Sequence, residues 1–234
     1  MAMENKRCIV SGMFRPEPIT GETLSDGSLV LTYDDGPGPN TLPVAEYLSG
    51  MGIEATFFVV GQFADRQPDV LTRLRALGHR VGNHTWTHYY EGLPKQLQDG
   101  GDIVEELKCT AALLAGDADS IAFRAPYGAW SPEVATVLSA DATLSAAHLG
   151  HIHWAIHCLD WAAWRDGVDP TVVATCFRDQ AKTIKKGIVL LHDYTADFPV
   201  IAAANRSAEL TRALVPILLA DGFRFVPLAA VPIH

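Results

Sequence analysis

The stretch that decides the fold reads Ser28-Leu-Val-Leu-Thr-Tyr-Asp-Asp-Gly-Pro-Gly-Pro-Asn40. Its first six residues, 28–33, are mostly apolar, β-branched or aromatic, which predicts a buried strand, and turn-forming residues follow directly. Apolar residues at three and four spacing over 41–50 predict a helix, and a second apolar run over 55–60 predicts another strand. A strand, a helix and a strand in this order are typical of a βαβ unit with parallel strands.

The same alternation continues along the chain. Further strands are predicted at 79–82, 122–124, 153–159, 187–191 and 223–226, and further helices at 68–77, 101–114, 131–138, 170–182 and 207–219. This repeated order predicts an α/β fold with a parallel sheet, either open and doubly wound or closed into a (β/α) barrel. Because no low-complexity linker divides the chain, we expect one domain over residues 1–234.

Composition excludes several classes of protein. The chain has 234 residues, of which 48% are hydrophobic and 19% charged, so it is globular and large enough to bury its own core. Its 18 basic and 27 acidic residues give a net charge of −9, and no basic cluster is present, so we expect no nucleic-acid partner. The most charge-poor stretch, 134–164, still contains Asp141 and Asp160, and no membrane span is predicted.

The N-terminus and the cysteines bear on the cellular compartment. The first residues lack the apolar run of a signal peptide, so a cytoplasmic location is expected, with a secreted or periplasmic one left open if a leader has been removed. Cys8, Cys109, Cys158 and Cys176 show no Cys-x-x-Cys spacing. Since a domain of this size needs no disulfide to fold, we predict reduced, packed thiols.

Polar residues cluster directly after the predicted strands, where a (β/α) barrel carries its catalytic residues. Asp34 and Asp35 follow the first strand and precede Gly36 and Pro37. This composition is compatible with a plain turn. It also suits chemistry, because one carboxylate can ligate a metal while the other remains free as a base.

His84 and His88 form the next cluster. They are four residues apart, so on a helical turn both imidazoles would face one direction, toward a shared metal. A second pair, His153 and His157, has the same spacing, and spacing alone therefore decides little. Two histidines together with Asp35 would leave an open position for water, which is a common way to build a catalytic zinc site.

Three later clusters each admit a structural and a catalytic interpretation. Arg124 either extends to solvent from a turn or pairs with a carboxylate. Asp160 either caps a helix or supports a reactive group, and His192 is either a satisfied buried histidine or a participant in catalysis. None of the three is decisive by itself.

Taken in order, these clusters resemble the signature motifs of the polysaccharide deacetylases of carbohydrate esterase family 4, also called the NodB homology domain. The five motifs are Thr32-Tyr-Asp-Asp-Gly-Pro37, His84-Thr-Trp-Thr-His88, Arg124-Ala-Pro-Tyr-Gly128, Asp160-Trp161 and Leu190-Leu-His192. The resemblance extends over residues 29–228. It implies a distorted (β/α) barrel with seven or eight strands.

The resemblance also implies an activity. Members hydrolyse N-acetyl groups, or sometimes O-acetyl groups, of sugars with a divalent metal that is usually Zn²⁺, with Co²⁺ or another divalent ion as alternatives. Carried over residue by residue, the metal ligands would be Asp35, His84 and His88, and the general base would be Asp34, oriented by Arg124. The general acid would be His192, supported by Asp160, and the oxyanion would face the backbone N–H of Tyr127.

Three positions depart from the family pattern. Tyr33 stands where Phe is common, and we expect this change to leave the metal site intact. Glu54 replaces a basic residue found in many members, so Arg124 would orient the base alone. His157 stands where an acidic or small polar residue is expected. We favour a strand histidine hydrogen-bonded within the barrel, and the alternative is a substrate contact.

Our leading hypothesis is a metal-dependent N-deacetylase acting on N-acetylhexosamine units of an acetylated oligo- or polysaccharide, such as a chitooligosaccharide or peptidoglycan. The alternatives are an O-acetyl esterase on xylan-like glycans, a hydrolase of a non-sugar amide, and a non-catalytic glycan-binding protein. Aromatic residues near the motifs, of which two or three are expected to contact sugar, are Trp86, Tyr89, Tyr90, Trp130, Trp161 and Trp164. No pattern predicts the oligomeric state.

Overall fold

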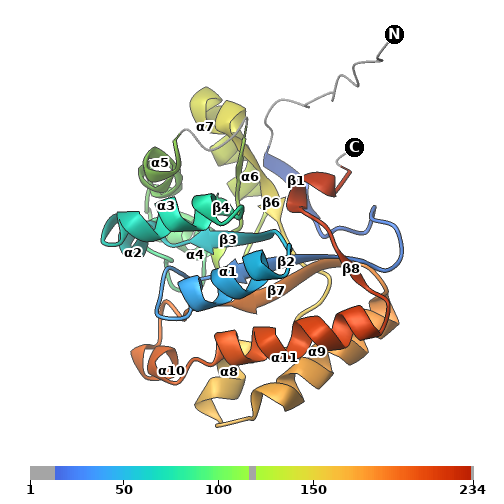
Figure 1. Cartoon of the computed structure of the whole chain (residues 1–234). Coiled ribbons are helices and arrows are strands. Elements are labelled where there is room, and N and C mark those ends of the chain that lie inside the picture. Colours follow the sequence, from blue (N-terminus) through green and yellow to red (C-terminus); the bar gives the residue numbers. More distant parts are fainter. Residues whose placement is uncertain (1–13, 116–119, 233–234) are drawn as a thin grey trace.

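The structure is a computed structural model that describes residues 14–115 and 120–232, and a parallel sheet lies at its centre (Figure 1). The strands of this sheet follow the order β4 (Arg80–Asn83), β3 (Ala55–Val59), β2 (Ser28–Asp34) and β7 (Gly187–His192). Every neighbouring pair is parallel, and the short strand β8 (Arg224–Phe225) pairs with the start of β2. The predicted parallel sheet is therefore confirmed.

A second, three-stranded sheet completes the strand layer. Its order is β1 (Phe14–Ile19), β6 (His148–Ile152) and β5 (Ile121–Ala122), again with parallel pairing. Single bridges join it to the first sheet, from Asn83 to Phe123 on one side and from Ile156 to Val189 on the other. The strands thus surround a common interior without continuous ladders, and the fold is a distorted (β/α) barrel.

Helices cover the outside of the strands, and α9 and α11 lie side by side over β7 and β2 (Figure 1). The longer helices are α1 (Thr41–Gly50), α3 (Pro68–Ala76), α5 (Ile103–Leu114), α6 (Pro132–Ala140), α9 (Pro170–Ile184) and α11 (Ser207–Ala220). The shorter ones are α2 (Gly61–Asp65), α4 (Leu93–Gln98), α7 (Ala142–Ala147), α8 (Asp160–Arg165) and α10 (Pro199–Ala203). Within the described ranges, no helix combines the length and the apolar character that crossing a bilayer requires.

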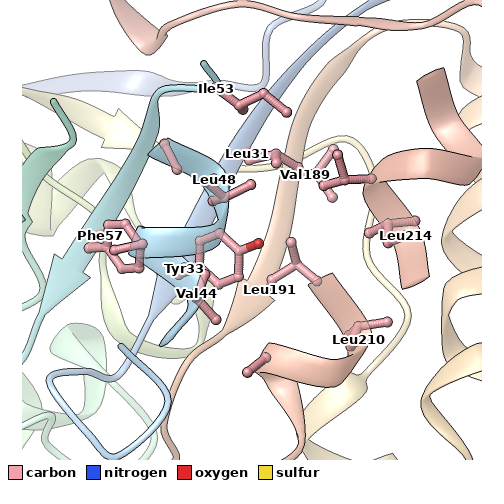
Figure 2. Packing of buried hydrophobic residues seen from close by; sticks show 14 of the residues in the cluster. Leu31, Tyr33, Val44, Leu48, Ile53, Phe57, Val189, Leu191, Leu210 and Leu214 are labelled. Carbon is pink, nitrogen blue, oxygen red and sulfur yellow. The ribbon is translucent and has the colours of Figure 1, made fainter. Parts of the chain in front are cut away.

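The main core lies between the sheet and these helices. Alternate residues of β2, namely Leu29, Leu31 and Tyr33, point outward and pack against α1 and α11 (Figure 2). Tyr33 is fully buried, and its hydroxyl forms a hydrogen bond of 2.9 Å with the Thr211 hydroxyl. The side chain that replaces the family's Phe therefore belongs to the outer core, and the opposite face of the strand is left for the barrel interior.

The remaining residues of β2 face the barrel interior, because side chains alternate along a strand. Val30 packs inside, and a buried apolar group that includes Leu24, Leu228 and Val231 fills the same interior region. Asp34 ends β2 directly beside His192 of β7 in the strand register. The alternation thus brings polar side chains together at the carboxyl ends of the strands.

Most of the predicted elements are confirmed to within two residues at each end, and α1 matches its predicted range. The predicted strand at 153–159 is wrong, because β6 ends at Ile152 and the following segment contributes only an isolated bridge. The backbone of His157 forms hydrogen bonds with a side chain instead of a neighbouring strand. The Gln180 amide group of α9 accepts the N–H of His157 and donates to its carbonyl. A ladder is therefore not needed there.

The strand β1 was not predicted. Its sequence, Phe-Arg-Pro-Glu-Pro-Ile, contains Pro16 and Pro18, which argue against a central strand because proline cannot donate to a ladder. β1 lies at the edge of the second sheet, next to β6 alone. Prolines are tolerated in such a position.

The prediction of reduced thiols is wrong for two of the cysteines. Cys158 and Cys176 form a disulfide, with their Cα atoms 6.2 Å apart. The segment that carries Cys158 lies against α9, which carries Cys176, a proximity that linear spacing does not indicate. Cys109 is free, and Cys8 lies outside the described residues.

Candidate active site

The structure brings the three predicted metal ligands together at the carboxyl ends of β2 and β4. Nε2 of His84 lies 3.4 Å from Oδ1 of Asp35, and Nε2 of His88 lies 3.2 Å from the same oxygen. All three side chains are buried, and their donor atoms lie within 4.8 Å of one another. In the described part of the chain, this is the only such group of three, and the second histidine pair forms none.

The loop that carries the histidines is irregular, so the expected helical turn is wrong. Thr85 and His88 both have left-handed backbone conformations, with φ of 68° and 56°. The buried carboxylate of Glu106 in α5 accepts hydrogen bonds from the backbone N–H groups of Trp86 and Thr87, at 2.9 and 2.8 Å. The loop is thus shaped by a carboxylate from a neighbouring helix, and both imidazoles still reach Asp35.

The outer nitrogens of the histidines show that this group fits a metal. Nδ1 of His84 lies 2.9 Å from the backbone carbonyl of Arg124, and Nδ1 of His88 lies 3.0 Å from a carboxylate oxygen of Asp197. An acceptor at Nδ1 keeps the proton there and leaves the lone pair of Nε2 facing the site. Two imidazole nitrogens and one carboxylate oxygen are a suitable ligand set for Zn²⁺ with an open position.

Charges within this ligand set favour the ionised forms of its members. Burial by itself would raise the pKa of Asp35, but His88 and a hydrogen bond from His84 hold that pKa well below its usual range. Burial would likewise lower the pKa of His88, yet Asp35 and Asp197 raise it to about 10. The carboxylate therefore stays negative, and a metal bound by this group would displace the proton that His88 carries on Nε2.

Asp34 lies next to the metal group and is held by Arg124. The guanidinium donates to Oδ1 of Asp34 at 2.7 Å and to the Thr32 hydroxyl at 2.8 Å. Arg124 is fully buried, and its guanidinium lies 4.3 Å from the centre of the Phe58 ring. The solvent-pointing interpretation of Arg124 is wrong, and the structure shows the pairing with a carboxylate.

His192 and Asp160 form a pair on the other wall. The carboxylate of Asp160 lies 2.8 Å from Nδ1 of His192 and also accepts the backbone N–H of that residue at 2.8 Å. Burial opposes a charged imidazole, but Asp160 raises the pKa of His192 to about 9. Asp160 begins α8, and both hydrogen bonds that its carboxylate accepts come from His192.

Tyr127 lines the same pocket as this pair. It occupies a short 3₁₀ turn, Pro126–Gly128, with φ of 58°, and its ring packs 4.9 Å from that of His88. The Tyr127 hydroxyl donates to the carboxylate of Asp197. The assignment of its backbone N–H to an oxyanion stays a prediction.

A pocket of about 260 Å³ opens over these groups. Six predicted residues line it, namely Asp34, Asp35, His88, Tyr127, Asp160 and His192, whereas His84 and Arg124 are buried and do not. Trp161 also lines the pocket and stacks on Phe198, with ring centres 6.3 Å apart. Among the other aromatics proposed from sequence, Trp164 is buried in the core, so it is not available to sugar.

Sequence reasoning missed five residues of the pocket wall, which are Trp154, Leu159, Thr195, Asp197 and Phe198. It also misplaced His157, which is exposed at the pocket wall rather than buried in a barrel strand. Glu54 lies before the first residue of β3, at the end of the strand remote from the site, and forms an ion pair with Arg80 at 3.5 Å. It therefore has no part in orienting Asp34.

Known proteins are similar to this chain in sequence and in fold. Residues 21–143 match the model of the polysaccharide deacetylase family. A chitooligosaccharide deacetylase of Bradyrhizobium sp. (strain ANU 289) is 34% identical over 219 residues, which are 89% of this chain and 92% of the relative. Peptidoglycan-N-acetylglucosamine deacetylase PgdA of Listeria monocytogenes serotype 1/2a (strain EGD / Mackaness) is 28% identical over 95% of this chain and 42% of its own length. A family 4 acetyl xylan esterase from Clostridium thermocellum, in complex with a cobalt ion, has the same fold, with a TM-score of 0.65, 24% identity and coverage of 87% and 89%. The chain therefore belongs to the polysaccharide deacetylase family, carbohydrate esterase family 4, and is a carbohydrate deacetylase.

Proposed function

We propose that the protein is a metal-dependent hydrolase that removes N-acetyl groups from N-acetylhexosamine units of an oligo- or polysaccharide. The observation that carries the proposal is a single pocket that combines a histidine–histidine–carboxylate group, a separate carboxylate held by arginine, and a histidine–aspartate pair. Chitooligosaccharide is the favoured substrate class, because the chain covers 92% of the similar chitooligosaccharide deacetylase. Peptidoglycan is a weaker candidate, since the chain covers 42% of PgdA.

Asp35, His84 and His88 would hold the metal, and Zn²⁺ suits this ligand set best. When bound, the ion would lower the pKa of a coordinated water toward about 7 and polarise the acetyl carbonyl. Asp34 would take the proton from the attacking water, and Arg124 fixes its carboxylate by a hydrogen bond to one oxygen. The other carboxylate oxygen remains available for the proton.

The leaving amine needs a proton, which His192 is placed to donate. Asp160 keeps the imidazole oriented and favours its charged form near neutral pH. The negative oxygen that develops on the acetyl group would receive a hydrogen bond from the Tyr127 backbone N–H. Losing a donor of this kind costs about 3 kcal/mol of transition-state stabilisation in comparable sites. Trp154, Trp161 and Phe198 provide apolar surface for the sugar.

The test is acetate release by the zinc-loaded protein from chitooligosaccharides of several lengths, peptidoglycan fragments and acetylated xylan. Asp34→Asn serves as the blank, and protein stripped by a chelator shows the dependence on metal. Turnover on N-acetylated sugars that both controls lack would support the proposal. Turnover confined to xylan would identify an O-acetyl esterase, and sugar binding without any release would identify a glycan-binding protein.

A further inference from the structure

The segment that follows β7, residues 193–198, contacts several parts of the site although it belongs to none of the sequence motifs. The backbone N–H of Ala196 donates to Oδ2 of Asp35 at 3.0 Å. One residue later, Oδ2 of Asp197 lies 3.0 Å from Nδ1 of His88 and also accepts the Tyr127 hydroxyl. This segment therefore touches two proposed metal ligands and the proposed oxyanion donor.

The contact between Asp197 and His88 affects the orientation of the His88 ring. Nε2 of His88 faces Asp35, and Nδ1 on the far side of the ring lies 3.0 Å from Oδ2 of Asp197, an ion-pair contact in which the N–H is not aligned for a hydrogen bond. A carboxylate in that position fixes the tautomer and the orientation of a ligating histidine and makes it a stronger donor. His84 has only the backbone carbonyl of Arg124 at its outer nitrogen. A charged acceptor thus supports one of the two histidines.

The contact between Asp197 and Tyr127 helps to hold the backbone conformation of Tyr127. A non-glycine residue with φ of 58° is held in an uncommon conformation that neighbouring structure must maintain. The Tyr127 ring is held by its tilted contact with the His88 ring and by its hydrogen bond to Asp197. Anchoring the ring at its hydroxyl therefore holds the turn that carries the proposed oxyanion donor.

We propose that Asp197 is a positioning residue that couples the metal ligand His88 to the oxyanion-facing turn at Tyr127. The inference rests on the proposed function, which assigns the metal to His88 and the oxyanion to Tyr127. The same carboxylate oxygen accepts the Tyr127 hydroxyl and forms the ion-pair contact with His88, so Asp197 links the positions of the two residues. Its effect passes through these two residues, and contact with substrate is not required.

Asp197→Asn tests the coupling, because an amide retains the shape of the carboxylate but loses its charge. We expect metal affinity, measured by chelator competition, to fall by about 10- to 100-fold. The visible spectrum of the Co²⁺-substituted protein should change as well, since the orientation of His88 is no longer fixed. Asp197→Glu restores a carboxylate and should recover part of the affinity, which a merely space-filling role would not predict.

Tyr127→Phe separates the two contacts. It removes the hydroxyl but leaves Asp197 beside His88, so kcat should fall while metal affinity stays within about threefold of the native value. Asp99→Asn is the matched control, because Asp99 is an exposed carboxylate that also accepts a tyrosine hydroxyl, from Tyr89 at 2.8 Å. It should change neither metal affinity nor the Co²⁺ spectrum.

The outcomes distinguish this inference from the proposed function. If the native protein neither binds metal nor releases acetate, the proposed function fails. If it does both and Asp197→Asn matches it in metal affinity, Co²⁺ spectrum and kcat, only the coupling role is overturned. Circular dichroism of each metal-free variant establishes that it is folded, and should Asp197→Asn not fold, the Asp197→Glu and Tyr127→Phe results decide.

Discussion

Asp160→Asn is the most informative single change to the proposed acid. In the native protein the Asp160 carboxylate accepts two donors, the backbone N–H of His192 and its Nδ1–H. An amide has one acceptor oxygen, so satisfying the backbone turns its NH₂ group toward Nδ1. This arrangement favours the neutral imidazole, with Nδ1 as an acceptor and the single proton on Nε2. Because a neutral imidazole is a far weaker acid than imidazolium, the change weakens the acid that the leaving amine needs.

The magnitude follows from the pKa of His192, which Asp160 raises from 6.5 to about 9 against the effect of burial. The difference corresponds to roughly 3 kcal/mol in favour of the protonated ring. At pH 8 about nine-tenths of the native protein would carry the proton, compared with about 3% for a pKa near 6.5. At pH 6 both forms would be largely protonated. The ratio of native to variant kcat/KM should thus grow about 20- to 30-fold between pH 6 and pH 8.

The assay is acetate release from a chitooligosaccharide across this pH range, with Asp166→Asn as control because Asp166 is an exposed carboxylate next to the last residue of the same helix. Stability gives a second readout. Because the folded pKa is raised, this contribution is complete below about pH 6.5 and is lost as the pH rises through about 9. A native-to-variant activity ratio that stays constant from pH 6 to pH 8 would refute the reasoning.

Three other substitutions test the supporting structure. Arg124→Met leaves Asp34 as a buried carboxylate without its partner, so urea denaturation should show a loss of about 3 to 5 kcal/mol, and an unchanged midpoint would contradict the pairing. Glu106→Gln removes the charge behind the hydrogen bonds to the histidine loop, and we expect thermal unfolding to show a loss of about 2 kcal/mol, with weaker zinc binding by titration. Cys158→Ser opens a loop closed over a separation of 18 residues, which should cost about 3 kcal/mol relative to the oxidised protein. Reduced native protein should then match the Cys158→Ser variant, and a difference between them would show that the serine itself perturbs the fold.

Much of the site could be predicted from the sequence, because strand alternation and register are local properties. Placing Asp34 at the end of β2 and His192 at the end of β7 requires only the recognition of two apolar runs. Parallel pairing then sets their carboxyl ends side by side. The confirmed strands at these positions are therefore sufficient to bring a base and an acid to one edge of the sheet.

Site contacts made by segments without a helix or strand pattern of apolar residues could not be predicted from the sequence. Asp197 lies in a stretch with no apolar alternation, and only the folded path of the chain after β7 brings it to His88. Trp154 and His157 lie in a segment whose apolar pattern favours a strand, although Gln180 satisfies part of its backbone in another conformation. Tertiary hydrogen bonds overrode the local preference there, which moved two side chains to the pocket wall.

Backbone conformation explains how adjacent residues can serve one pocket. Asp34 and Asp35 are neighbours, and regular strand geometry would direct their side chains to opposite faces. Both nevertheless line the pocket, because the chain leaves the strand at Asp35 with φ of 73°. Thr85, His88 and Tyr127 also have positive φ, and each such residue other than glycine costs roughly 1 kcal/mol or more. Asp and His are enriched in the left-handed region, but neither type predicts it at a given position. The conformations persist because partners such as the buried Glu106 and the half-buried Asp197 stabilise the neighbouring loops, so the same hydrogen bonds that shape the site also offset its strain.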